Sequence, residues 1–236
     1  RHSSSAASDV YKRQVPPLMT PDQADQRFEE AVAIAVEKCA ADTAGQRCYI
    51  CLEAVDPDTN EGLVRGCSCR GGAGIAHVSC LARQAQVAVQ RGAQNGWKRW
   101  DTCGLCEQEY HGVVACALGW ACWKTYVGRP EEDQDRLDAM NLLGNGLSYG
   151  GHHEDALSVR ETDLSMMRRH GGSESDLLIV QGNLANTYNS LGRREEALSM
   201  RREVYSETSK LYGEEHREAL REANNYAAAL KHLNRH

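Results

Sequence analysis

The fold of this chain is decided by four short motifs, CYIC (48–51), CSC (67–69), HVSC (77–80) and CGLC (103–106). Each motif carries two side chains that can bind a metal ion, through a sulfur or an imidazole nitrogen. In three of the motifs two residues separate the ligands, which lets one tight turn aim both at the same tetrahedral ion. CSC has a single residue between its ligands, a spacing that a turn beginning at Gly66 accommodates.

These ligands predict two closed, four-coordinate zinc sites. In chain order the ligands are Cys48, Cys51, Cys67, Cys69, His77, Cys80, Cys103 and Cys106. Thiolates favour zinc over calcium or magnesium, and a site without an open position is structural rather than catalytic. Eight ligands can be shared between two ions sequentially or in an interleaved order. The surrounding sequence is rich in glycine and poor in apolar runs, which is typical of a small domain that folds around its metal.

The rest of the 236-residue chain has an ordinary globular composition, with 41% hydrophobic and 25% charged residues. A formal net charge of −6 does not favour a nucleic-acid partner, because such binding requires a basic face. The longest apolar run, at 113–123, is shorter than the roughly 20 residues of a spanning helix, so we expect a buried helix and no membrane partner. We see no secretory signal, and we therefore expect a cytoplasmic protein whose cysteines bind metal rather than form disulfides.

The C-terminal half of the sequence repeats itself. Asn141, Asn183 and Asn225 recur with a period of 42, and GHHEDALSVR (151–160) matches GRREEALSMR (192–201). A period of this length with alternating helices and turns predicts stacked helix pairs. The segments resemble tetratricopeptide repeats (TPR) of the longer variety found in kinesin light chain. About two and a half such repeats are present.

The three recurring asparagines have two interpretations. A helical residue that recurs in every repeat returns to the same face, so Asn141, Asn183 and Asn225 are expected to form one ladder. Their amides can bind the backbone of a peptide in the concave surface, because an amide both donates and accepts hydrogen bonds. Alternatively, they bond neighbouring turns inside the solenoid. We expect a peptide or protein partner on the repeat surface.

The order of four cysteines, one histidine and three cysteines resembles both RING-CH and PHD fingers. One residue separates Cys67 from Cys69 and seven separate Cys69 from His77, a spacing that favours RING-CH. The letters CYICLE (48–53) are also similar to that family. The resemblance implies an interleaved cross-brace. It assigns one zinc to Cys48, Cys51, His77 and Cys80, and the other to Cys67, Cys69, Cys103 and Cys106.

RING-CH proteins are typically ubiquitin ligases, which grip a ubiquitin-conjugating enzyme and act by positioning, without a catalytic nucleophile of their own. The resemblance implies that Ile50 contacts this enzyme. Two residues depart from the family pattern: Gln84 stands where many ligases carry a tryptophan, and Glu107 stands where a cation is common. We expect Trp100, or its neighbour Trp97, to replace the missing tryptophan as a partner contact.

Two other functions are weighed against the ligase. A non-catalytic adaptor, in which the zinc domain only binds proteins or caps the repeats, is favoured by Gln84, Glu107 and the short repeat array. A PHD-like reader of histone tails is weaker, because the ligand spacing and the acidic balance speak against it.

The sequence divides into four segments. Residues 1–20 are expected to form a disordered or non-native tail. A helix is expected over 21–44, with Thr20 as its N-cap and a proline in its first turn. The RING-CH finger covers 45–111 and the repeat region covers 112–236. The predicted fold is therefore a small α+β, zinc-stabilised cross-brace domain followed by an all-α helical-repeat solenoid.

Overall fold

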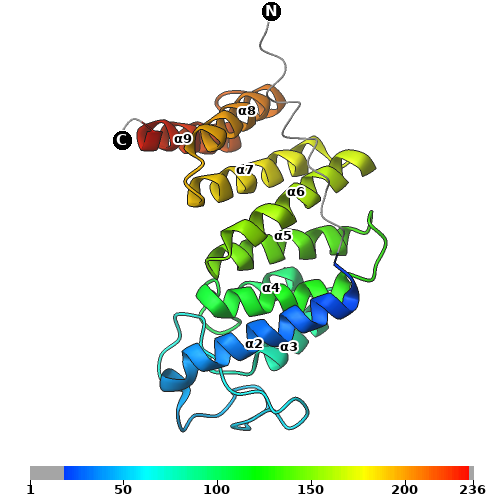
Figure 1. Cartoon of the computed structure of the whole chain (residues 1–236), viewed down its shortest axis with the longest axis vertical. Helices are drawn as coiled ribbons and strands as arrows, with labels where there is room; N and C mark the ends of the chain where they lie inside the picture. The colour runs from blue at the N-terminus through cyan, green and yellow to red at the C-terminus, as the bar shows by residue number, and fades with distance from the viewer. Residues whose placement is uncertain (1–18, 234–236) are drawn as a thin grey trace, which may run out of the picture.

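The computed structural model describes residues 19–233, so most of the tail expected at 1–20 lies outside the described residues. Within this range the chain is a stack of helices with a loop-rich domain at one end (Figure 1). The helices are α2 (Pro21–Thr43), α3 (Val78–Gln90), the 3₁₀ helix η1 (Gly96–Trp100), α4 (Gly112–Tyr126), α5 (Gln134–Tyr149), α6 (His153–His170), α7 (Glu174–Ser190), α8 (Arg194–Tyr212) and α9 (Arg217–Leu233).

Helix α2 begins at the cap that the sequence predicts. The Gln23 backbone N–H donates to Thr20 Oγ1 at 3.3 Å, and the Thr20 N–H donates to Gln23 Oε1 at 2.9 Å. This reciprocal capping box satisfies two backbone donors at the helix start. The buried face of the helix, which includes Ala31, Ala35 and Cys39, belongs to the same core as the zinc domain.

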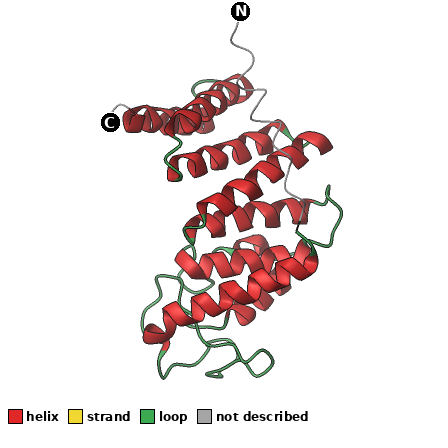
Figure 2. Cartoon of the chain, in the orientation of Figure 1, coloured by secondary structure: helices red, strands yellow, loops and turns green. Residues whose placement is uncertain are grey.

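The loop-rich domain contains little β structure. In the part of the chain that the structure describes, its β component amounts to two antiparallel bridges, Val64–Ala76 and Thr102–Glu109. Figure 2 draws these segments as loop. The α component consists of α3 and η1. Because so few backbone ladders hold the domain, its order depends on side chains and on what those side chains bind.

Helix α4 is the apolar run that the sequence predicted to be a buried helix. It packs against α2 on one side and against α5 on the other. A Cβ at Gly119 would lie 3.3 Å from Leu143 Cα, and one at Gly146 would lie 2.6 Å from Ala115 O, so glycine allows the α4 and α5 backbones to approach closely. The hydrophobic core therefore runs without a break from the loop-rich domain into the repeats. No helix among the described residues is both long and apolar enough to cross a membrane.

The predicted repeat is visible in the backbone. Helices α5 and α6 form one pair, α7 and α8 form the next, and α9 follows. Gly151 and Gly192, which match in the sequence repeat, both lie in turns and have φ of +83° and +74°. Gly171 and Gly213 match in the same way, with φ of +74° and +93°. These left-handed positions favour glycine, which explains why the repeat retains it there.

A buried arginine in each helix pair ties neighbouring helices together. Arg160 on α6 donates to Asn145 Oδ1 at 2.8 Å and to the Asn183 carbonyl oxygen at 3.0 Å. Arg201 holds the equivalent place on α8, donating to Asn186 Oδ1 and to a carboxylate oxygen on α9. These side-chain bonds satisfy polar groups that the stacked helices bury.

Asp163 is a buried acid within this stack. Its side chain on α6 has no exposed surface, and among residues 19–233 neither of its carboxylate oxygens has a hydrogen-bond partner. Burial raises the pKa of Asp163 to about 7, the negative charge of Asp138 adds to the shift, and Arg160 opposes it. The ionised form therefore destabilises the folded state.

We expect Asp163→Asn to stabilise the protein increasingly as the pH rises. The folded-state pKa lies above the unfolded value, so the favourable contribution of protonated Asp163 is complete below about pH 4 and is lost as the pH rises towards 7. Relative to the variant, the wild type should lose about 2–3 kcal/mol of unfolding free energy between roughly pH 5 and pH 8. Urea unfolding across this range measures the difference, and a difference that does not change with pH would contradict the expectation.

Candidate metal centres

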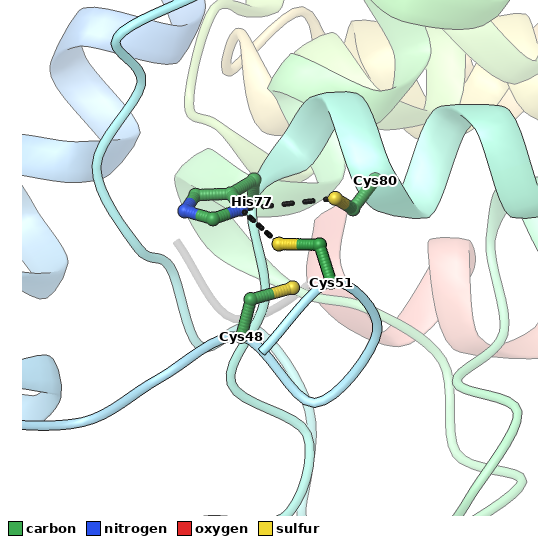
Figure 3. A group of neighbouring side chains, drawn as sticks. All are labelled: Cys48, Cys51, His77 and Cys80. Atoms are coloured by element: carbon green, nitrogen blue, oxygen red, sulfur yellow. Dashed lines mark hydrogen bonds between the residues drawn. The ribbon is translucent and has the colours of Figure 1, made fainter. Parts of the chain in front are cut away.

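The first group of ligands consists of Cys48, Cys51, His77 and Cys80, whose ligand atoms all lie within 4.8 Å of one another (Figure 3). The two residues of CYIC lie in the loop after α2, whereas His77 and Cys80 lie at the start of α3. His77 Nδ1 is 3.4 Å from Cys51 Sγ and 3.7 Å from Cys80 Sγ. The sulfurs and the ring nitrogen therefore converge on one point between the loop and the helix.

The second group has the same construction. Its ligand atoms also lie within 4.8 Å of one another, and its members are Cys67, Cys69, Cys103 and Cys106. Cys69 Sγ is 3.8 Å from Cys103 Sγ. The first and third motifs of the chain thus share one group, and the second and fourth share the other. This interleaved order excludes the sequential alternative and produces a cross-brace.

The two CxxC turns have the same backbone hydrogen bonds. In the first turn the Leu52 N–H donates to the Cys48 carbonyl oxygen at 2.9 Å. In the last turn the Glu107 N–H donates to the Cys103 carbonyl oxygen at 3.0 Å. The backbone N–H of the third residue of each CxxC motif donates to the sulfur of the first cysteine at 3.4 Å in both turns. Leu52 and Glu107 occupy the same place in the two turns, with φ of +69° and +57°. The same ligand spacing is therefore accompanied by the same turn in both motifs.

The residues present fit two structural zinc ions. Around a tetrahedral zinc, two bound sulfurs lie ~3.8 Å apart, and a sulfur and a nitrogen lie ~3.6 Å apart. The observed sulfur–sulfur distance of 3.8 Å and nitrogen–sulfur distances of 3.4 Å and 3.7 Å match these values. Sets of three cysteines with one histidine, and of four cysteines, are typical of structural zinc. The prediction of two structural zinc ions is thus confirmed by the ligand geometry.

Burial and neighbouring groups shift the pKa values of the ligand thiols in both directions. Burial is the largest cause that raises the pKa of Cys80, and the charge of the neighbouring Cys48 adds to it. Burial also raises the pKa of Cys67. At the exposed edge a backbone hydrogen bond from Gln108 lowers the pKa of Cys106 to about 7. A bound zinc ion lowers the pKa of every thiol that coordinates it, so that each of these thiols is deprotonated.

Gly74 is a site residue that sequence reasoning missed. Its φ is +73°, and a Cβ there would lie 2.7 Å from both Cys67 Sγ and Cys69 Cβ. The chain therefore passes so close to the second group that glycine alone fits. The run RGGAG (70–74) marks a tight loop, but the sequence does not tell which of its glycines touches the ligands.

The prediction that Trp100 contacts a partner is wrong. Its side chain has no exposed surface, and its ring packs edge-on against Tyr126 of α4, with 6.2 Å between the ring centroids. Trp97 is partly buried and packs against the same tyrosine at 5.1 Å. The insert before the last motif therefore folds inwards onto α4, where its tryptophans extend the core.

Ile50 lies in the first CxxC turn, next to a residue that contacts α3. Its neighbour Tyr49 places its hydroxyl 3.4 Å from Gln84 Oε1 on α3. A Cβ at Gly104 in the last CxxC turn would lie 3.8 Å from the same Gln84 oxygen and 3.4 Å from Arg99 Nη1. The two CxxC turns and α3 thus lie next to one another, and Ile50 is partly buried against the core.

The structure shows both predicted features among the recurring asparagines, a bond between helices and a place on a concave surface. Asn183 Nδ2 donates to Asn141 Oδ1 at 3.1 Å across α7 and α5, which is the bonding between neighbouring turns. Asn225 donates to Glu222 Oε2 at 3.1 Å within α9. Asn183 and Asn225 also line a groove of about 540 Å³ between α7, α8 and α9. Asn183 thus both joins two helices and borders the groove, whereas Asn225 borders the groove and bonds within its own helix.

Comparison with known proteins gives one domain match and one structural likeness. The family model described as the RING-variant domain matches residues 48–106, from the first predicted ligand to the last. This segment is a RING-variant domain. A crystal structure described as "Podosopora anserina putative kinesin light chain nearly identical TPR-like repeats" aligns with a TM-score of 0.43 and 22% sequence identity. The alignment covers 65% of this chain and 66%, just under two thirds, of that one. No curated protein matches the chain.

Proposed function

We propose that this chain, whose residues 48–106 form a RING-variant domain, is a zinc-dependent ubiquitin ligase. The interleaved Cys₃His and Cys₄ groups within that domain are the observation that carries the proposal. In it, one zinc is held by Cys48, Cys51, His77 and Cys80, and the other by Cys67, Cys69, Cys103 and Cys106. The ions fix the loops, and the loops present a surface that grips a ubiquitin-conjugating enzyme. In this proposal the chain positions the conjugating enzyme and contributes no nucleophile of its own.

The proposed docking surface for the conjugating enzyme spans both CxxC turns and the exposed side of α3. Leu52, directly after the first CxxC motif, and Leu105, inside the last one, expose 66% and 53% of their surface. Ile50 lies in the first turn, and Gln84 joins α3 to it through Tyr49. Exposed apolar side chains on a rigid scaffold are typical of a protein contact, and they support this placement.

A second surface, the groove between α7 and α9, is proposed to hold the substrate or another protein partner. Asn183 and Asn225 offer amides that can bond the backbone of an extended peptide, and Ile179 offers an exposed apolar contact. At the base of the groove Arg201 and Glu222 pair at 3.0 Å. Because these two charges balance each other, the groove suits a peptide that binds mainly through its backbone and apolar side chains.

Replacing Ile50 by alanine is expected to lower ubiquitin-chain formation by at least about 10-fold with the best of a panel of conjugating enzymes. An apolar side chain at the centre of a protein contact contributes at least about 1.4 kcal/mol, which corresponds to that factor. The variant should still bind two zinc ions in native mass spectrometry, because Ile50 is not a ligand.

Ile34→Ala is the matched control for this assay. It makes the same substitution on α2, where the side chain is 41% exposed and outside the zinc domain. The control should retain wild-type activity. If the two variants lose activity equally, or if the wild type forms no chains with any conjugating enzyme, the ligase proposal fails.

A non-catalytic adaptor is the second candidate, and two residues favour it. Glu107, exposed in the last CxxC turn, is a carboxylate and cannot donate hydrogen bonds when ionised. Gln84 is an exposed amide on α3. An adaptor would retain groove-bound proteins in a pull-down with the whole chain but none of the conjugating enzymes.

The cytoplasm is the proposed location for either activity. None of the ten cysteines, all of which the structure describes, forms a disulfide, and seven of them belong to the two ligand groups. Reduced thiols that can bind zinc persist in the cytoplasm, whereas oxidising compartments favour disulfides.

A further inference from the structure

Helix α3 begins directly after a predicted metal ligand, which leaves its first backbone N–H groups without the usual side-chain cap. His77 is the N-cap residue of the helix, but its side chain makes no capping hydrogen bond, because its Nδ1 faces the sulfurs of the first group. The first N–H groups of a helix have no partner within the helix and must be satisfied from elsewhere. Val78, the first residue of α3, is fully buried, so water does not reach this end of the helix freely.

Glu61 satisfies two of these N–H groups from a loop 17 residues earlier in the chain. The Val78 N–H donates to Glu61 Oε1, and the Ser79 N–H donates to Oε1 at 3.4 Å and to Oε2 at 3.2 Å. The Ser79 hydroxyl also donates to Oε2. The Glu61 side chain is only 7% exposed. A carboxylate here caps the helix and complements the positive end of its dipole.

The loop that carries Glu61 is closed by its own hydrogen bonds. The Asp56 N–H donates to the Glu61 carbonyl oxygen, and the Asn60 N–H donates to the Asp56 carbonyl oxygen, both at 2.9 Å. Asp56 Oδ1 accepts the Thr59 N–H at 3.0 Å. Glu61 is therefore held in place before it meets the helix. The loop approaches the ligands at a second point as well, because Asp56 Oδ2 lies 3.8 Å from Cys80 Sγ.

We infer that Glu61 is a positioning residue for the first zinc site, an inference that rests on the proposed zinc binding. Both ligands from the third motif depend on the start of α3: His77 precedes its first residue and Cys80 lies in its first turn. By binding the N–H groups between them, Glu61 fixes the direction of that turn and hence the placement of both ligands. Groups that orient metal ligands from outside the coordination shell typically change metal affinity about 10–100-fold.

The experiment uses the whole chain loaded with cobalt(II) in place of zinc. Tetrahedral cobalt absorbs differently in Cys₃His and Cys₄ surroundings, so the two sites can be followed separately. Competition with a chelator is compared for the wild type, Glu61→Ala, Glu61→Gln and Glu53→Ala. Glu53 is the matched control, because it is an exposed glutamate two residues after Cys51 and its removal takes the same charge from the same neighbourhood.

Glu61→Ala should release cobalt from the Cys₃His site at about 10–100-fold lower chelator concentration, with the Cys₄ site unchanged. Glu61→Gln retains an acceptor oxygen and should fall between the alanine variant and the wild type, while Glu53→Ala should match the wild type. If Glu61→Ala does not fold, Ser79→Ala tests the same contact and should shift the Cys₃His site alone, by a smaller factor.

The inference is overturned if both sites weaken together, if neither changes, or if Glu53→Ala reproduces the effect. A wild-type chain that binds no metal would instead overturn the proposed zinc centres, and the role of Glu61 with them. Two ions in the wild type without a selective effect of Glu61 would leave the centres standing and remove only the positioning role.

Discussion

Removal of zinc by a chelator is expected to unfold residues 48–106 and to lower the stability of the whole chain by several kcal/mol. In small zinc domains the metal contributes about 10–16 kcal/mol of apparent binding free energy, which is then folding free energy. Without metal, the backbone hydrogen bonds that hold the described part of this domain are those of two isolated β-bridges, α3, η1 and the turns. Because its core continues into α4, unfolding should also remove packing from that helix.

Circular dichroism and thermal unfolding, before and after chelation, measure this loss, and native mass spectrometry counts the ions released. Two zinc ions should leave, and the melting temperature should fall. Added zinc should restore the original melting curve, whereas magnesium at the same concentration should not, because thiolate ligands favour zinc. A metal-free chain that melts like the untreated protein would contradict the expectation.

Gly74→Ala is expected to empty the second zinc site while the first site stays filled. The new Cβ would lie 2.7 Å from Cys67 Sγ, a separation that forces the ligand or the backbone to move. We expect a loss of about 2–4 kcal/mol of unfolding free energy, of which the left-handed φ accounts for roughly 1 kcal/mol. Native mass spectrometry should then find one zinc per chain in place of two.

Gly71→Ala is the matched control for this substitution. Gly71 has a φ of +63°, close to the +73° of Gly74, and no described atom lies within 4 Å of a Cβ built there. Its variant should lose about 1 kcal/mol, from the backbone conformation alone, and should keep both ions. Equal losses of stability and metal in the two variants would show that contact with the ligands is unimportant.

The sequence predicted the metal centres well because ligand spacing is a local property. Two ligands separated by two residues can be read as one half-site without knowing the fold, and the structure joins these half-sites as the RING-CH resemblance implies. The same holds for the repeats, whose glycine turns recur at matching positions. In both cases the pattern lies within a short segment and can be recognised without the rest of the fold.

The residues around the centres could not be predicted in this way, because their roles depend on distant segments. Glu61 caps a helix 17 residues away, and an isolated glutamate carries no sign of this. Gly74 is critical only because the chain brings it against two sulfurs. Trp100 was assigned to the surface by analogy, whereas the insert that carries it folds against α4. Arg160 and Asn145 are likewise paired by the stacking of helices.

The glycines at Gly119 and Gly146 place α4 directly on the backbone of α5, and one hydrophobic core continues from the zinc domain into the repeat helices. If the chain acts as the proposed ligase, the stacked helices would set the distance and orientation between a protein held in the groove of the last helices and an enzyme docked beside the zinc loops. The position of each lysine on the captured protein would then decide whether it can accept ubiquitin. Lengthening the connection between α4 and α5 would change which lysines are reached.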